Sequence, residues 1–278
     1  MPAETESAAS FVASRDGTRI AYRAWPKSGA TITLAVAHGL GEHSGRYAAF
    51  AESMAKRGMG TFAMDLRGHG LSGGQRGHVD SWTDWLDDIG AFLGVVETHV
   101  SGEVVPLGHS FGGAAMLSAA LDDRLRGARR FIVSSPALKA KVAVPRWKTA
   151  LGGVMSSVAP RFALSNEVDA GTLSRIPDVV TAYRTDPLVH PKISSRMYTE
   201  WQKATRDILA RAGSIQLPFL ITAGADDKLI DPQGAEELHR RAANRSELAV
   251  LAGRYHEPFN DLGSDEVFDL IAAWLARA

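Results

Sequence analysis

Short runs rich in apolar and β-branched residues alternate along this chain with longer stretches whose apolar residues recur every three or four positions. Runs of the first kind predict strands, and the longer period predicts helices. The predicted strands are 18–25, 31–39, 60–66, 104–110, 129–135, 217–224 and 247–253. The predicted helices include 46–58, 81–100 and 264–278. This alternation is typical of an α/β fold in which helices cover both faces of a mostly parallel sheet.

The closing helix shows the pattern most clearly. Ser264 is a candidate N-cap, and the acidic residues that follow it suit the positive end of a helix dipole. One apolar stripe then runs through Val267, Leu270, Ile271, Trp274 and Leu275. The stripe predicts a helix that docks on the sheet.

The alternation stops after Ser135. Up to Gly213 the chain contains helical patterns and turns but no convincing strand. Pro145 suits a helix start, and one apolar side follows at Trp147, Leu151, Val154 and Val158, with a second at Ile193, Met197, Trp201 and Ile208. We therefore expect a core of residues 1–135 and 214–278, with a helical cap of residues 136–213 inserted after the sixth strand. The apolar sides suit a long acyl chain, and packing against the core explains them equally well.

Composition narrows the function classes. Basic and acidic residues both number 31, so no positive surplus favours nucleic acid as a partner. No apolar run approaches the roughly 20 residues that a membrane-spanning helix needs, and the first residues, MPAETESAAS, do not resemble a secretion signal. The expected location is therefore the cytoplasm. The absence of cysteine excludes a thiolate nucleophile and Cys-ligated zinc.

Two serines, Ser72 and Ser110, lie in the pattern Gly-x-Ser-x-Gly. A nucleophile elbow requires a strand directly before the serine, a helix directly after it, and glycines that let a strained turn pack closely. Ser110 lies between VVPLGH and FGGAAML and meets these conditions. Ser72 has polar loop residues on both sides, which indicates a turn. Ser110 is therefore the predicted nucleophile.

The acid and the base of such a site follow the serine in that order along the chain. After the predicted strand 217–224, the loop offers Asp226, Asp227 and Asp231. Asp227 is favoured because the apolar Leu229 can anchor its loop inward.

The general base is selected from nine histidines. His256 alone lies in the loop between the last predicted strand and the closing helix. Six of the others precede the acid, His190 is in the predicted cap and His239 is in a predicted helix. His256 is therefore the predicted base.

Backbone amides can stabilise the oxyanion of an acyl-transfer reaction because they are oriented before the charge forms. The glycines of His38-Gly39-Leu40-Gly41, directly after a predicted strand, free the backbone to turn its amides inward. We expect the N–H groups of Leu40 and Phe111 to form the oxyanion hole.

Seven stretches resemble the monoacylglycerol lipase and lysophospholipase branch of the α/β-hydrolases. They are HGLGEHSGRY at 38–47, DLRGHGLSGG at 65–74, GHSFGG at 108–113, SSPAL at 134–138, TDPLV at 185–189, GADDKLID at 224–231 and YHEPFND at 255–261. The first is the most specific, and the resemblance extends from about residue 10 to residue 278. It implies the α/β-hydrolase fold, the Ser110, Asp227 and His256 triad, and a helical cap over an acyl tunnel.

The resemblance also makes Glu42, Arg46 and His109 candidates for the side of the pocket that binds glycerol. A simpler interpretation is that Glu42 and Arg46 pair with each other and brace their loop.

The predicted reaction is hydrolysis of a carboxylic ester through an acyl-enzyme, which requires no metal or organic cofactor. The expected substrate is a small-molecule or lipid ester, above all a monoacylglycerol, and the cap's apolar face also suits contact with a bilayer surface. Alternatives are a lysophospholipase, a broad-specificity carboxylesterase, and a non-catalytic binding protein that retains the fold. An aminopeptidase would need acidic residues for a substrate ammonium group, and the cap offers Glu167, Asp169, Asp178 and Asp186.

Overall fold

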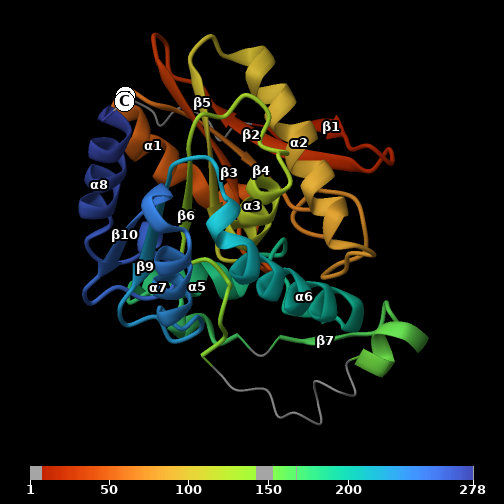
Figure 1. Ribbon diagram of the computed structural model, residues 1–278. Helices are drawn as coiled ribbons and strands as arrows, with labels where there is room; N and C mark the ends of the chain where they lie inside the picture. The colour runs from red at the N-terminus through yellow and green to blue at the C-terminus, as the bar shows by residue number, and fades with distance from the viewer. Residues whose placement is uncertain (1–7, 142–152, 167, 278) are drawn as a thin grey trace.

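The computed structural model describes residues 8–141, 153–166 and 168–277. Its largest element is an eight-stranded sheet with the order β1-β2-β4-β3-β5-β6-β9-β10 (Figure 1). These strands are β1 (Ser10–Ala13), β2 (Arg19–Trp25), β3 (Ile32–Ala37), β4 (Gly60–Met64), β5 (Glu103–His109), β6 (Phe131–Ser134), β9 (Phe219–Gly224) and β10 (Ser246–Leu251). β2 is antiparallel to both of its neighbours, β1 and β4. The other neighbouring pairs in this sheet, from β4-β3 to β9-β10, are parallel. The predicted mostly parallel α/β fold is confirmed.

Helices cover both faces of this sheet, as Figure 1 shows. They are α1 (Ala48–Lys56), α2 (Trp82–His99), α3 (Phe111–Leu121), α7 (Gln233–Arg241) and α8 (Ser264–Ala276). Alternate side chains of β3 supply two cores: Leu34 and Val36 pack with α1 and α8, whereas Ala35 and Ala37 pack with α2 and α3. The sheet is thus buried on both faces, which explains the apolar runs of its central strands.

Two details at the ends of the chain differ from prediction. β1 was not predicted, because it is a four-residue edge strand with largely exposed side chains and carries little apolar pattern. α8 forms as expected, but Ser264 is its first residue and Gly263, at φ 77°, takes the N-cap position. A left-handed backbone at that position explains why glycine precedes the helix.

The segment between β6 and β9, residues 136–213, is called here the cap segment. Its described part lies along the lower edge of the sheet in Figure 1. Its described elements are β7 (Ala163–Ser165), α5 (Pro177–Thr185), β8 (Lys192–Ser194) and α6 (Ser195–Arg211), and residues 153–158 are also helical. β7 and β8 form an antiparallel pair. The prediction that this segment lacks strands is therefore wrong, because three-residue strands are too short to show a period. The helix start expected at Pro145, with Trp147 and Leu151, lies outside the described residues.

The two apolar stripes expected in the cap segment have different environments. Met197, Trp201 and Ile208 of α6 are buried and belong to the core that contains α3. The indole of Trp201 also donates a hydrogen bond of 2.7 Å to the carbonyl of Ala137. Val158, by contrast, is 72% exposed. The α6 stripe is thus explained by core packing, whereas residues 153–165 leave apolar side chains at the surface.

Three buried imidazoles lie where the cap segment meets the core. The ring of His69 lies 5.3 Å from that of His38 and 4.7 Å from that of His190. His38 donates from Nδ1 to the carbonyl of Gly39, and His190 donates from Nε2 to the carbonyl of Gly68. Burial lowers the pKa of all three, in the case of His190 to about 4. Neutral imidazoles therefore connect the loop after β3, the loop after β4 and the cap segment.

Within the described ranges, no helix is both long and apolar enough to cross a bilayer.

Candidate active site

Ser110 occupies a forced turn between β5 and α3. Its backbone angles are φ 52° and ψ −114°, in a region that L-residues rarely adopt. The surroundings hold this conformation: the Ser110 N–H donates to the carbonyl of Ser134 at 2.9 Å, and its carbonyl accepts from the N–H of Ala137 at 2.9 Å. This is the strand–turn–helix geometry that projects a serine hydroxyl from a nucleophile elbow.

The flanking glycines are required by close backbone contacts. A Cβ on Gly108 would lie 2.4 Å from the carbonyl oxygen of Gly112. A Cβ on Gly112 would lie 2.2 Å from the carbonyl oxygen of Ala37, at the end of β3. The elbow thus forms only because two strands and a helix start approach each other at positions without side chains.

The three residues predicted as nucleophile, base and acid lie in one hydrogen-bonded chain. His256 Nδ1 is 2.7 Å from Asp227 Oδ2, and His256 Nε2 is 3.0 Å from Ser110 Oγ. Because a carboxylate only accepts, Nδ1 carries the proton, and Nε2 is left to accept from the serine hydroxyl. All three side chains are buried.

The charges in this chain favour the arrangement. Burial by itself lowers the pKa of His256, but the carboxylate of Asp227 outweighs it and raises that pKa above its ordinary value. Burial raises the pKa of Asp227, but His256 and the N–H groups of Leu229 and Ile230 lower it overall. Asp227 is thus held ionised where it can stabilise a protonated imidazole.

The other acidic candidates of this loop do not contact His256. Asp231 accepts from the N–H of Gln233 and pairs with Lys139, 2.7 Å away. The N–H of Asp226 donates to the carbonyl of Arg254. Ser72, the other serine in the elbow pattern, donates to the carbonyl of Asp65 and accepts from the N–H of Ala21. Its hydroxyl has a structural role that joins two strands.

Leu40 and Phe111 lie on the two backbone segments that meet at the elbow. The N–H of Gly112 donates to the carbonyl of His38 at 3.0 Å, which joins the start of α3 to the loop after β3. In the part of the chain that the structure describes, the N–H groups of Leu40 and Phe111 have no hydrogen-bond partner. Both are therefore available to an incoming oxygen.

Glu42 and Arg46 do contact each other. Glu42 Oε1 accepts from the N–H of Gly39 at 2.7 Å and from the hydroxyl of Tyr47 at 3.2 Å. Glu42 Oε2 accepts from Arg46 at 2.8 Å. Burial opposes ionisation of Glu42, but Arg46 and neighbouring imidazoles lower its pKa to about 2. Glu42 thus braces the loop that carries Leu40, as the simpler interpretation expected.

His109 lies against the base. Its ring is 5.0 Å from that of His256, and its Nδ1 is buried without a hydrogen-bond partner among the described residues. Burial, reinforced by His256, lowers the pKa of His109 to about 4. A neutral ring beside the base leaves His256 as the proton acceptor.

Sequence reasoning missed two polar contacts of the site. Glu257, next to the base, pairs with Arg46 through two hydrogen bonds of 2.7 Å. His43, in the loop after β3, donates from Nε2 to Asp186 of the cap segment at 2.8 Å. The partners in these pairs are 211 and 143 residues apart, and no local pattern identifies them.

The sequence matches the Hydrolase_4 family, described as Serine aminopeptidase, S33, over residues 29–263. The chain belongs to this family. A monoacylglycerol lipase of Mycolicibacterium smegmatis is 33% identical over 99% of both chains. An uncharacterized abhydrolase domain-containing protein of Dictyostelium discoideum is 32% identical over 97% of this chain, which spans 29% of that longer relative. The crystal structure of a Paleococcus ferrophilus monoacylglycerol lipase superposes with a TM-score of 0.81 at 32% identity, over 93% of this chain and 98% of that one.

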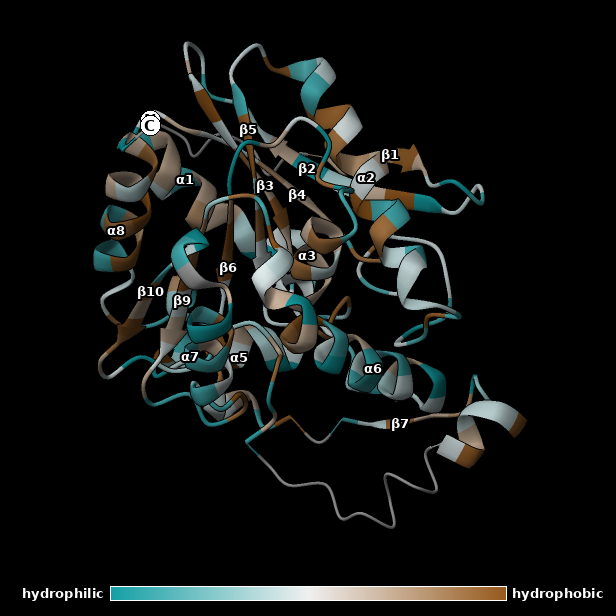
Figure 2. Ribbon diagram, in the orientation of Figure 1, coloured by the Kyte–Doolittle hydropathy of each residue, from teal (hydrophilic) through white to brown (hydrophobic). Residues whose placement is uncertain are grey.

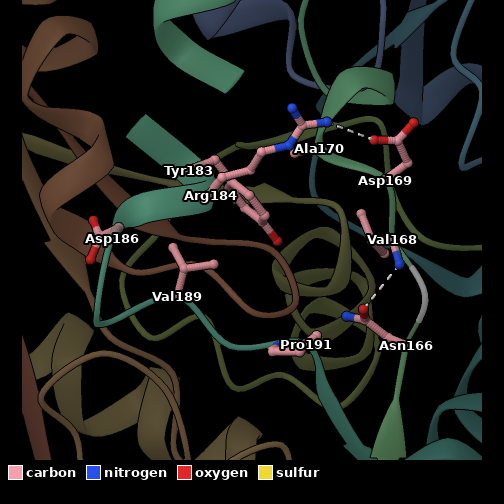
Figure 3. A pocket seen from close by; sticks show the side chains of 9 residues that line it. All are labelled: Asn166, Val168, Asp169, Ala170, Tyr183, Arg184, Asp186, Val189 and Pro191. Carbon is pink, nitrogen blue, oxygen red and sulfur yellow. Dashed lines mark hydrogen bonds and ion pairs between the residues drawn. The ribbon is translucent and has the colours of Figure 1, made fainter. Parts of the chain in front are cut away.

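The cap segment contacts the elbow, because the ring of Trp201 on α6 lies 4.9 Å from that of Phe111. One pocket lies within this segment. Figure 3 shows this pocket, which has a volume of about 270 Å³. Its walls are Asn166, Val168, Asp169, Ala170, Tyr183, Arg184, Asp186, Val189 and Pro191. Tyr183 also stacks on Arg46, whose guanidinium carbon is 4.9 Å from the ring centre. Tyr183 therefore contacts both the pocket and the Arg46 guanidinium.

Substitution of Gly112 by alanine is expected to disrupt the elbow. The added Cβ meets two backbone carbonyls, so G112A is expected to lower the free energy of unfolding by about 2 kcal/mol or more. Gly90, in the middle of α2, has no heavy atom closer than 4.0 Å to such a Cβ. G90A is expected to be neutral or stabilising by about 0.5–1 kcal/mol. Chemical denaturation of both variants checks this, and equal stability of G112A and wild type would contradict it.

Proposed function

We propose that this protein is a serine hydrolase of carboxylic esters that acts through an acyl-enzyme, and that monoacylglycerols are its substrates. The observation that carries the proposal is the hydrogen-bonded chain from Ser110 through His256 to Asp227, which begins at a strained elbow. The monoacylglycerol lipases of Mycolicibacterium smegmatis and Paleococcus ferrophilus, similar over nearly the whole chain, support the substrate class.

In the proposed mechanism His256 Nε2 removes the proton of Ser110 as Oγ attacks the ester carbonyl. Asp227 keeps Nδ1 protonated and stabilises the imidazolium that forms. The N–H groups of Leu40 and Phe111 donate to the oxyanion. His256 then protonates the leaving alcohol and activates the water that releases the fatty acid. Apart from the ester and water, this chemistry uses only groups of the chain.

Charge around the base favours an uncharged alcohol. Asp227, Glu42 and Glu257 place three carboxylates around His256. Among the described residues, Arg46 pairs with Glu42 and Glu257, and the exposed Lys141 donates to the backbone carbonyl of Asp227 at 2.7 Å. A phosphate on the leaving group would add negative charge to this buried surplus, which costs electrostatic energy. Glycerol carries no charge, so a monoacylglycerol is favoured over a lysophospholipid.

The aminopeptidase alternative has less support from the described side chains. Glu42 and Glu257 are engaged by Arg46, Asp186 accepts from His43, and Asp169 pairs with Arg184. Glu167 lies outside the described residues, and Asp178 is exposed on α5. A substrate ammonium group would have to compete with these existing partners.

The first test is covalent labelling with a fluorophosphonate probe. Wild type is expected to be labelled and to hydrolyse p-nitrophenyl butyrate. Ser110→Ala is expected to lose labelling and at least about 1000-fold of the rate, because it removes the attacking oxygen. Ser72→Ala, matched in local pattern, is expected to keep labelling in its folded fraction. A folded wild type that stays unlabelled would instead favour an inert binding protein.

Head-group preference is the second test. Rates are compared for oleoyl esters of glycerol, glycerophosphate and glycerophosphocholine at equal acyl length. The glycerol ester is expected to be hydrolysed at least about tenfold faster than the glycerophosphate ester, because of the buried negative surplus. Faster hydrolysis of either phosphorylated ester would contradict the monoacylglycerol assignment and would favour a lysophospholipase.

We further propose that the surface of residues 153–165 rests on lipid. Val154, Val158, Phe162 and Leu164 are each more than half exposed. Figure 2 shows brown, hydrophobic stretches on the short helix before β7. Exposed apolar side chains of this kind suit contact with a bilayer surface, where insoluble esters are held.

Sedimentation with phosphatidylcholine–phosphatidylglycerol vesicles tests this surface. Wild type is expected to pellet with the vesicles, and F162S/L164S is expected to remain largely in the supernatant because it removes apolar contact area. Hydrolysis of dissolved p-nitrophenyl butyrate should be unchanged in that variant. Equal pelleting of both proteins would reject this surface as the membrane contact.

A further inference from the structure

Arg46 forms a buried bridge between two loops of the site. Its Nη1 lies 2.8 Å from Glu42 Oε2 and 2.7 Å from Glu257 Oε1, and its Nη2 lies 2.7 Å from Glu257 Oε2. The pair with Glu257 is bidentate, which fixes orientation as well as distance. One guanidinium therefore connects the loop that carries Leu40 to the residue directly after His256.

The bridge is shielded from solvent. The side chains of Arg46, Glu42 and Glu257 are 10%, 4% and 5% exposed. Tyr183 covers the guanidinium on the side of the cap segment. Asn260 Nδ2 donates a further hydrogen bond of 3.1 Å to Glu257 Oε2. Screening by water and salt is therefore weak at these charges.

A contribution to stability does not by itself explain why this bridge of Arg46, Glu42 and Glu257 is buried. Buried ion pairs lose much of their solvation, and well-packed apolar residues often replace them without loss of stability. The location of Glu257 offers another explanation, because its main chain continues directly from the base.

We propose that Glu257 is a positioning residue for His256: held by Arg46, it fixes the loop of the base against the loop that carries Leu40. The inference rests on the proposed ester hydrolysis and concerns how that site is tuned.

The charged and titratable groups around His256 come from four other parts of the chain besides its own loop. They are Asp227 in the loop after β9, Glu42 in the loop after β3, Arg46 in the following turn of helix, His109 at the end of β5, and Glu257 itself. Burial lowers the pKa of His256, and Asp227, Glu257 and Glu42 together raise it above its ordinary value. Removal of the Glu257 charge therefore lowers this pKa.

The pH profile of kcat/KM measures this change in the pKa of His256. The base acts only when its imidazole is neutral, so activity falls as the pH drops through the pKa of His256 in the free enzyme. With Glu257→Gln, the acidic limb is expected to move to lower pH by about one pH unit. If Glu257 had only a structural role, its substitution would lower kcat/KM without moving the acidic limb of the profile.

Glu257→Asp separates charge from geometry. The shorter side chain keeps its charge but cannot reach both guanidinium nitrogens unless the base loop moves. We expect kcat to fall about tenfold with the acidic limb unchanged. If E257Q does not fold, as circular dichroism would show, E257D decides alone: an unaltered kcat would overturn the positioning role.

Glu103 provides a matched control. It forms a bidentate pair with Arg130, at 3.0 and 2.9 Å, and its side chain is 8% exposed. It lies at the start of β5, whereas the elbow follows the end of that strand. E103Q is expected to leave both the limb and kcat unchanged, and a limb that moves equally in E103Q and E257Q would overturn the inference.

Measurements on the wild-type protein distinguish failure of this inference from failure of the proposed function. A wild type without esterase activity and without fluorophosphonate labelling refutes the function. An active, labelled wild type whose acidic limb coincides with that of folded E257Q refutes only the role of Glu257.

Discussion

The left-handed backbone at Ser110 is the constraint on which the rest of the site depends. This conformation is costly for a residue with a side chain, so the surroundings must hold it. They do so with hydrogen bonds from β6 and from the residues that follow it, and with two glycines that admit backbone at van der Waals distance. Because β3, β5 and α3 meet at this point, Ser110 lies beside the loop that carries Leu40.

The remaining side chains approach from loops at the same ends of the parallel strands. Asp227 follows β9 and His256 follows β10, whereas Glu42 follows β3. A parallel sheet brings such loops to one edge whatever their separation in sequence. The ion pairs of Arg46 then fix two of these loops relative to each other, which the sheet by itself cannot do.

The fold and the central hydrogen-bonded residues could be predicted because their signals are local. Ser110 has a strand before it and a helix after it, and Asp227 and His256 follow strands in a known order. β1, β7 and β8 could not be predicted, because three or four residues carry too little periodicity. Glu257 was missed for another reason: its role depends on Arg46, 211 positions away, and nothing in YHEPFND indicates which cation it faces. The role of the apolar stripe on α6 was ambiguous, because a helix face has the same sequence pattern whether it packs against protein or against a ligand.

The cluster of His38, His69 and His190 limits the acidity at which the cap segment and the core stay joined. Burial holds these three pKa values, and that of His109, below their ordinary range, whereas that of His256 is raised. Below about pH 6.5 the unfolded chain therefore takes up more protons than the native protein, and each such imidazole reduces native stability as the pH falls. The same packing that keeps these rings dry therefore makes the native protein less tolerant of acid.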